Sequence, residues 1–263
     1  MTISKLSWQR VACLGAGLAF ASCADVSHRR DTAADERATT QLIQEQFAPA
    51  LRLARASRAN GDLTSAINLY RSVTSIKPAD PAVVVELGDT LVDAGLFDDA
   101  IHIYQQVPRN SSAAASALLG LEQAYLTLGS PAEALRYAAE ARLAAPNDSR
   151  VMIGQGVALD MLARHSEAQP LYRAVLALTP HNVAARNNLA LSLAMTQQYD
   201  EAIQIMMPMA KSANATPRIR QNLALIYGLA GDAPRAAVLS RMDLDAATTE
   251  ANLHFFELAR AAR

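Results

Sequence analysis

Few residues in this chain have the types and the spacing that catalysis or metal binding requires. No two of its histidines lie four residues apart, the spacing that puts two metal ligands on one face of a helix. The five histidines are His28, His102, His165, His181 and His254. The segment Gly154-Gln155-Gly156 matches half of a dinucleotide-binding fingerprint, but Leu159 replaces the third glycine and we expect no strand before it.

The sequence also lacks the nucleophile elbow GxSxG, the phosphate-binding loop GxxxxGK[ST] and the metalloprotease helix HExxH. We therefore predict that the protein is not an enzyme and uses neither a metal ion nor a cofactor. The opposite reading, an enzyme with an unrecognised site, would need a cleft of convergent titratable groups, and the sequence offers no such cluster.

The two cysteines lie near the start of the chain, and their surroundings indicate a targeting segment. Lys5 and Arg10 precede an uncharged apolar run over residues 11–20, which contains Cys13. As a helix this run would rise about 15 Å, half the thickness of a bilayer core, so it is typical of a signal peptide and not of a membrane span. Beyond Cys23 the chain has no cysteine, which excludes a disulfide framework and a cysteine-based metal site.

The residues that end at Cys23, Phe20-Ala21-Ser22-Cys23, resemble a bacterial lipobox in which phenylalanine replaces the usual leucine. The resemblance implies cleavage before Cys23 and lipidation of its sulfur; the alternative is a buried cysteine beside an ordinary cleavage site. In Gram-negative lipoproteins an aspartate after the cysteine favours the inner membrane, so Ala24 implies an outer-membrane anchor with the protein facing the periplasm. We interpret residues 1–22 as a lipoprotein signal peptide and residues 23–46 as a polar tether running into the first helix.

The composition favours helices and argues against a nucleic-acid partner. Hydrophobic residues make up 51% of the chain and aromatic residues 5%, and the excess is alanine and leucine, which favour closely packed helices. The 24 basic and 25 acidic residues give a formal net charge of −1, whereas nucleic-acid binders usually carry a basic surplus.

An alanine recurs every 34 residues over six units without an insertion, at Ala66, Ala100, Ala134, Ala168, Ala202 and Ala236. Two apolar segments at helical spacing make up each unit. The turn between them falls at Gly61, Gly95, Gly129, Ala163, Gln197 and Gly231. The alanine lets the two helices approach closely, and a large residue one turn later, such as Tyr104, fills the space beside it. Asp80, Ser130 and Thr216, each followed by proline, have the pattern of helix N-caps.

This pattern resembles the tetratricopeptide repeat over residues 47–250. Its units would begin at Phe47, Pro81, Ala115, Ser149, Val183 and Pro217. The resemblance implies an all-α fold, a right-handed superhelical solenoid of about six helix pairs, with residues 251–263 as a C-terminal capping helix. The family's glycine at the eighth position survives only as Gly88 and Gly156, and its bulky residue at the fourth position is replaced by Arg186 and Arg220 in the last two units.

The first helix of each unit should line a concave face that binds a protein partner. Steps of three and four residues keep one side of a helix, so the second, fifth, ninth, twelfth and thirteenth positions should point inward. The resemblance also implies that asparagines at the sixth position bind a peptide backbone, although they can equally satisfy groups between helices. The predicted partner-binding residues are Asn187, Asn188, Leu191, Met195, Arg218, Gln221, Asn222, Leu225 and Leu229. This mixed lining suits a helix or an extended segment, and we expect no small-molecule substrate.

Residues 184–263 resemble the TadD-like lipoproteins of the Flp (Tad) pilus assembly system. The stretches that carry the resemblance are ARNNLALSLAMTQQYDEAI, TPRIRQNLALIYGLAGD and ANLHFFELAR. It implies a pilotin-like adaptor or scaffold on the outer membrane, with the secretin or another pilus component as its partner. The alternatives are a repeat lipoprotein of type IV pilus secretin assembly, outer-membrane protein insertion or peptidoglycan-enzyme scaffolding, and a self-assembling structural protein.

Overall fold

The computed structural model describes residues 47–76 and 80–262, and every regular element in these residues is an α-helix. Residues 47–59 form the first described helix. The elements that follow are α2 (Leu63–Ile76), α3 (Pro81–Asp93), α4 (Phe97–Gln105), α5 (Ala114–Thr127), α6 (Pro131–Ala144), α7 (Ser149–Met161), α8 (His165–Leu178), α9 (Val183–Met195), α10 (Tyr199–Ala210), α11 (Pro217–Ala230), α12 (Ala233–Ser240) and α13 (Ala246–Ala261). The expected signal peptide, Cys23 and the tether lie outside the described residues.

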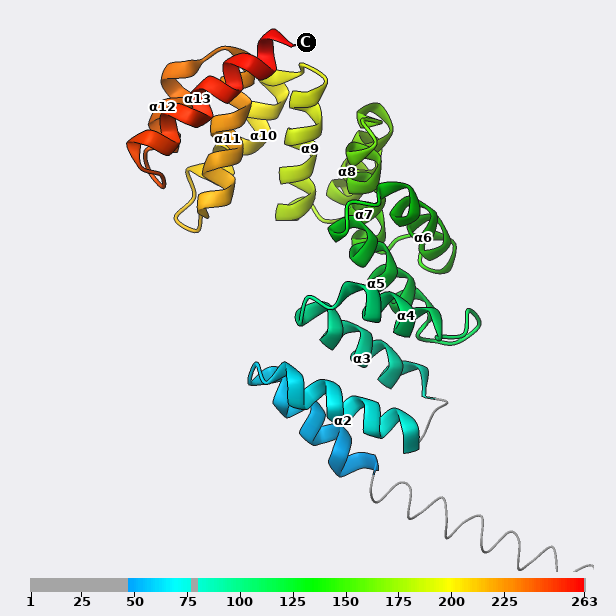
Figure 1. Cartoon of the computed structure of the whole chain (residues 1–263). Coiled ribbons are helices and arrows are strands. Elements are labelled where there is room, and N and C mark those ends of the chain that lie inside the picture. The colour runs from blue at the N-terminus through cyan, green and yellow to red at the C-terminus, as the bar shows by residue number, and fades with distance from the viewer. Residues whose placement is uncertain (1–46, 77–79, 263) are drawn as a thin grey trace, which may run out of the picture. The chain divides into compact units, whose positions relative to one another are not determined.

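Each described helix packs against the next one along the chain, so the helices form pairs that stack in chain order (Figure 1). The first helices of neighbouring pairs also touch, α3 with α5, α5 with α7, α7 with α9 and α9 with α11. The predicted all-α stack of helix pairs is therefore confirmed. The first helices of successive pairs therefore lie side by side.

The turn inside each pair keeps one backbone conformation whatever residue stands there. Gly95 and Gly129 have φ values of 74° and 70°, and Ala163 and Gln197 have 58° and 62° at the same repeat position. Glycine adopts this left-handed conformation freely, whereas for other residues it costs roughly 1–2 kcal/mol. Packing of the flanking helices must impose the turn on Ala163 and Gln197.

Side-chain caps fix where several first helices begin. The Asp80 carboxylate accepts a hydrogen bond from the Ala82 amide at 3.1 Å, and the Thr216 hydroxyl accepts one from the Ile219 amide at 3.4 Å. Both N-cap predictions are confirmed. Ser130 also stands at the N-cap of α6 with Pro131 after it, as predicted, but its side chain makes no capping hydrogen bond.

The repeated alanines and the large residues that follow them form the core. All six alanines of the 34-residue period have no exposed surface, and Tyr70, Tyr104 and Tyr172 are at most 1% exposed. The Tyr104 ring lies directly on the backbone of two first helices, because a Cβ added at Gly88 or Gly120 would overlap it. These glycines permit the close approach of α3 and α5 around the ring.

The last helix, α13, packs against α11 and α12. Its Phe256 is 6% exposed and lies on the α11 backbone at Gly228, where an added Cβ would overlap the ring. The helix begins at Ala246, so it takes in the end of the range 47–250 that the sequence assigned to repeats. Among the described helices, none is both long and apolar enough to span a membrane.

Replacing Ala134 or Ala168 with leucine should destabilise the stack. Both side chains are fully buried at helix crossings, and overpacking of a core site typically costs about 1–3 kcal/mol. Denaturant unfolding of each variant measures the change. Ala139→Leu, at an exposed position of α6, is the matched control and should change stability by less than about 0.5 kcal/mol. Equal effects of Ala134→Leu and Ala139→Leu would contradict the assigned register.

Candidate partner-binding groove

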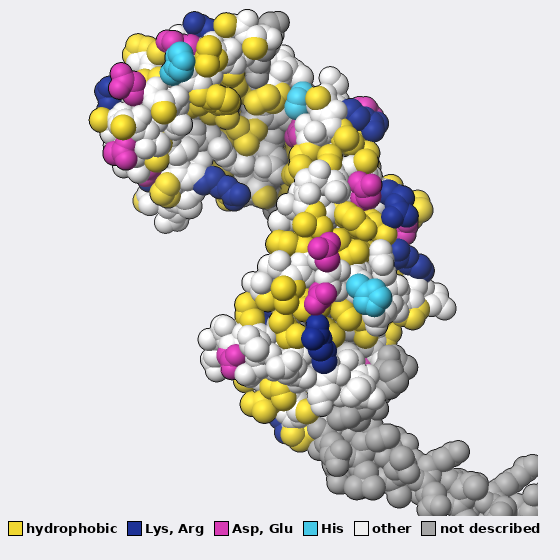
Figure 2. Space-filling view, in the orientation of Figure 1, with side chains coloured by type: hydrophobic (Ala, Val, Ile, Leu, Met, Phe, Trp, Pro, Cys, Tyr) yellow, Lys and Arg dark blue, Asp and Glu magenta, His cyan; other side chains and the backbone are white. Residues whose placement is uncertain are grey.

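A groove of about 650 Å³ crosses the first helices α3, α5 and α7. Arg58, on the helix over residues 47–59, and Ala184 of α9 also line it. Figure 2 shows apolar patches interrupted by acidic and basic side chains on the face of these helices that is turned to the viewer. An open groove of this mixed character suits a polypeptide segment better than a small apolar ligand.

The groove residues recur at the repeat positions that helical spacing turns inward. Three fifth positions contribute apolar side chains, Val85, Leu119 and Ile153. The ninth positions contribute Asp89, Gln123 and Val157, the twelfth positions Val92 and Leu126, and the thirteenth position Asp93. Equivalent positions of successive pairs therefore meet in one surface, as the stacking of identical units requires.

Acidic side chains at the α3 side of the groove are held by neighbouring donors. Arg58 Nε lies 2.7 Å from Asp93 Oδ2, and the Arg58 guanidinium lies 3.9 Å from Asp89. The Tyr104 hydroxyl donates a hydrogen bond of 2.7 Å to Asp89 Oδ1. Burial and the bond to Asp89 raise the pKa of Tyr104 above its ordinary value, so the phenol stays protonated and remains a donor.

Glu122 differs from these acids, because no described residue donates a hydrogen bond to its buried Oε2 atom. It lies in the floor of the groove with 2% of its surface exposed. Its Oε2 atom is buried and accepts no hydrogen bond from the described residues. Its Oε1 atom fills the space that a side chain at position 154 would need, which Gly154 leaves open. Burial raises the pKa of Glu122 to about 8, because a carboxylate without partners is poorly solvated in an apolar environment.

Asp160, at the twelfth position of α7, shows how a partly buried acid is otherwise satisfied. Tyr172 Oη donates to its Oδ2 at 2.8 Å, and Ser192 Oγ donates to its Oδ1 at 2.7 Å. His165 Nδ1 lies 2.8 Å from the same Oδ1 atom. The three contacts join α7, α8 and α9, so Asp160 is a structural group of this junction.

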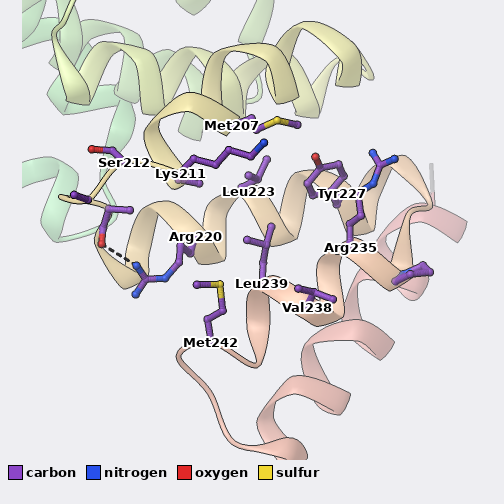
Figure 3. Close-up of a pocket in the computed structure, with 14 residues that line it drawn as sticks. Met207, Lys211, Ser212, Arg220, Leu223, Tyr227, Arg235, Val238, Leu239 and Met242 are labelled. Carbon is purple, nitrogen blue, oxygen red and sulfur yellow. Dashed lines mark hydrogen bonds between the residues drawn. The ribbon is translucent and has the colours of Figure 1, made fainter.

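A second pocket, of about 840 Å³, lies between α10 and α12 with α11 as its floor. Figure 3 shows that Leu223 and Tyr227 of α11 and Leu239 of α12 face it. The Arg235 guanidinium stands 5.3 Å from the centre of the Tyr227 ring. This pocket is on the second-helix side of the stack, and its lining is mainly apolar.

Models of the tetratricopeptide repeat match residues 57–111, 85–149 and 162–226, which together make up more than half of the chain. The chain belongs to the tetratricopeptide-repeat family. The matched residues include α3 and α5 at the groove and α10 with most of α11 at the second pocket, whereas α7 and α12 lie almost entirely outside them.

Relatives and solved structures agree with the assignment. The uncharacterized protein y4yS of Sinorhizobium fredii is 33% identical over 108 residues, 41% of this chain and 55% of that protein, so the chain spans about half of its length. A tetratricopeptide repeat protein of Parabacteroides merdae superposes with a TM-score of 0.69 at 18% identity, over 82% of this chain and 88% of that one. YrrB, described as a repeat protein with an unusual peptide-binding site, gives a TM-score of 0.52 at 18% identity, over 65% and 88% of the two chains. At these identities the structural likeness shows the fold alone.

The asparagines that the sequence singled out bond to one another between two first helices of the repeat stack. Asn222 Nδ2 donates to Asn187 Oδ1 at 2.7 Å, and Asn187 Nδ2 donates to Asn188 Oδ1 at 3.1 Å. All three side chains remain partly exposed. The network links α11 to α9, which is the role between helices that the sequence left open for them.

The other predicted residues take different positions. Leu191 and Leu225 are partly buried against the core, and Leu229 is only 2% exposed within it. Met195 and Arg218 are exposed, while Gln221 Nε2 donates to Asp243 at 3.1 Å. Leu229 lines neither the groove nor the second pocket. None of the nine predicted residues lines the groove across α3, α5 and α7.

The two arginines at the fourth repeat position also have partners within the chain. Arg220 forms a bidentate contact with Asp243. It also donates to the Ala215 carbonyl at 2.8 Å, the bond drawn as a dashed line in Figure 3. The bond to Arg220 holds the pKa of Asp243 below its usual range. Arg186 lies 3.1 Å from His181. The Arg220–Asp243 pair therefore joins α11 to the end of α12 and is a structural contact.

Sequence reasoning missed Glu122 and the central position of the groove. The signal for Glu122 is present, because it stands at the eighth position of its repeat, where the family has glycine. No group of three or more His, Cys, Asp or Glu side chains in the described residues is arranged to hold a metal ion.

Stability should fall as the pH rises, because of Glu122. Its pKa is about 8 in the folded protein and 4.5 when unperturbed. The folded state binds the proton more tightly, so the contribution to stability is complete below pH 4.5 and is lost as the pH rises through 8. With each pKa unit worth about 1.4 kcal/mol, the free energy of unfolding should decrease by a few kcal/mol.

Denaturant titrations across this pH range measure the effect. Glu122→Gln should remove most of the slope, because glutamine does not titrate. Glu133→Gln, at an exposed acid of α6, is the matched control and should leave it intact. An unchanged slope in Glu122→Gln would show that another group causes it.

Proposed function

We propose that this tetratricopeptide-repeat protein is a scaffold that holds a segment of a protein partner along its first helices. The observation that carries the proposal is the alignment of equivalent inward positions across α3, α5 and α7 into one groove. The fifth and ninth positions continue on α9 as Asn187 and Leu191, and on α11 as Gln221 and Leu225. A partner segment that leaves the groove toward α9 would therefore meet the predicted asparagine surface next.

We further propose that the scaffold is an outer-membrane lipoprotein acting as a pilotin-like adaptor in Flp (Tad) pilus assembly, with the secretin or another assembly component as its partner. The support is the lipobox-like stretch before Cys23, Ala24 after it, and the resemblance of residues 184–263 to the TadD-like lipoproteins. The second candidate is a scaffold of another outer-membrane machine, which the same groove would serve.

Filling the groove should abolish partner capture without unfolding the protein. Gln123 is exposed and lines the groove at the middle of α5, so Gln123→Trp places a large ring in the path of a bound segment. Crosslinking pull-down from membranes, with a known bait such as the secretin, measures capture. Gln204→Trp, at an exposed position of α10, is the matched control. Loss of capture in both variants, or in neither, would contradict the groove as the binding surface.

A second pair of variants separates the two stretches of the surface. Asn188→Ala with Asn222→Ala removes the asparagine groups, and each lost hydrogen bond should weaken binding by about 0.5–1.5 kcal/mol. Asn68→Ala with Gln204→Ala changes exposed residues of α2 and α10 instead and should have no effect. A melting curve for each variant accompanies the pull-down, and a loss of capture that only follows the melting temperature would reject direct binding by the asparagines.

Lipidation of Cys23 should anchor the protein. Each buried CH₂ group of an acyl chain contributes about 0.8 kcal/mol, so Cys23→Ala should leave the chain unprocessed or released from membranes. Metabolic labelling with a fatty-acid analogue and membrane fractionation measure the two effects, with Cys13→Ala as the control. If Cys23→Ala fractionates with the outer membrane to the same extent as the unmodified protein, a lipid anchor at Cys23 is excluded.

A further inference from the structure

Glu122 is a buried acid in the lining of the groove. It is 2% exposed, lines the groove, and its Oε2 atom receives no hydrogen bond from the described part of the chain. Buried polar side chains in proteins nearly always have partners, and leaving one unpaired is destabilising. An unpaired carboxyl oxygen in the lining of a groove is suited to accept a hydrogen bond from a bound molecule.

Comparison with the neighbouring repeats shows that packing does not require this acid. In the second pair, the Tyr104 ring fills the slot between Gly88 and Gly120. In the third pair the equivalent tyrosine is Ala138 and the equivalent of Gly88 is Glu122. In the third pair the Glu122 side chain of α5 therefore fills the slot, and Gly154 of α7 leaves room for it. A tyrosine and a glycine would fill the same space without a buried carboxyl group.

Among the described acids that line the groove, Asp89 and Asp93 have bonding partners, whereas the buried Oε2 atom of Glu122 has none. Arg58 is engaged with Asp93 and lies near Asp89. Arg150 of α7 contacts Asp148, with Nη2 2.6 Å from Oδ2. Burial is the cause of the raised pKa of Glu122, without a contribution from any of these charges.

We propose that Glu122 is the recognition residue for a lysine or arginine side chain of the bound partner segment. The inference rests on the proposed function, because it needs a polypeptide in the groove. A long basic side chain can lie along Leu119 and Ile153 with its apolar stem and present charged donors to the carboxyl group. Charged donors make the strongest hydrogen bonds to a carboxylate, and a cation also removes the penalty of its ionisation in the apolar floor.

The pairing should release a proton. With a pKa near 8, the free acid is mostly protonated at neutral pH, and a cation beside it lowers that pKa. Binding at neutral pH therefore converts the acid to its carboxylate and transfers the proton to the buffer. Affinity should rise as the pH increases toward 8, because less work is then needed to ionise the group.

The test uses the full chain and a random peptide library. Peptides that bind the unmodified protein but not Gln123→Trp are the probes, since they occupy the groove. Titration calorimetry at pH 7 in two buffers of different ionisation enthalpy counts the protons released. We expect the selected peptides to share a lysine or arginine, and binding to release a proton. In Glu122→Gln binding should weaken about tenfold or more with no proton release, while Glu133→Gln should behave as the unmodified protein.

Replacing the shared basic residue of the peptide with glutamine provides a second test that leaves the protein unaltered. It should cause the same loss, and Glu122→Gln should add no further loss to it. Groove-binding peptides that carry no basic residue, or that keep their affinity and proton release in Glu122→Gln, would overturn the role of Glu122 and leave the scaffold function standing. Failure to select any peptide that Gln123→Trp excludes would instead count against the scaffold function on which the inference rests.

Discussion

Stacking of the helix pairs depends on a large side chain that the second helix of one pair inserts between its own first helix and the first helix of the next pair. The Tyr104 ring touches the backbone of α3 at Gly88 and of α5 at Gly120, and 1% of it is exposed. Because neither helix has a Cβ at the contact, the ring determines how closely the helices approach and in which register. Tyr172 repeats one of these two contacts, against the α7 backbone at Gly156. Such contacts bring equivalent positions of the first helices together.

This constraint explains which features the sequence could predict. The alanine period, the turns and most caps act within one helix pair, so spacing alone reveals them; the left-handed turns at Ala163 and Gln197 follow from the period and not from the residue type. Contacts between pairs are different. The bonds from Asn222 to Asn187 and from Arg220 to Asp243 join residues far apart in the chain, so no local sequence pattern predicts them. For that reason the sequence alone could not show that Asn187 and Asn222, predicted to bind a partner, also link α9 to α11.

The tyrosines also connect the core to the acids of the groove side. The hydroxyl of Tyr70 donates to Glu86 at 2.9 Å, and those of Tyr104 and Tyr172 donate to Asp89 and Asp160. Burial and the bond to Glu86 raise the pKa of Tyr70 to about 12, so the phenol keeps its proton at neutral pH. Each ring therefore packs the helices and at the same time orients an acid, which ties the polar chemistry of the surface to the hydrophobic fit beneath it.

The third pair shows how such a stack can change its chemistry without changing its fold. Contacts in a repeat protein reach only from one unit to the next, so a new side chain at one position must be accommodated only by its immediate neighbours. Glu122 replaces a glycine, Ala138 replaces the tyrosine that would have occupied the slot, and Gly154 makes room on the next helix. Glu122 and Ala138 depart from the pattern together, while Gly154 repeats Gly120 of the preceding unit and the alanines and turns on either side keep the pattern. In a chain built from one repeated unit, the residues that keep the repeat pattern explain the fold. Residues at neighbouring positions that depart from the pattern together are the candidates for function.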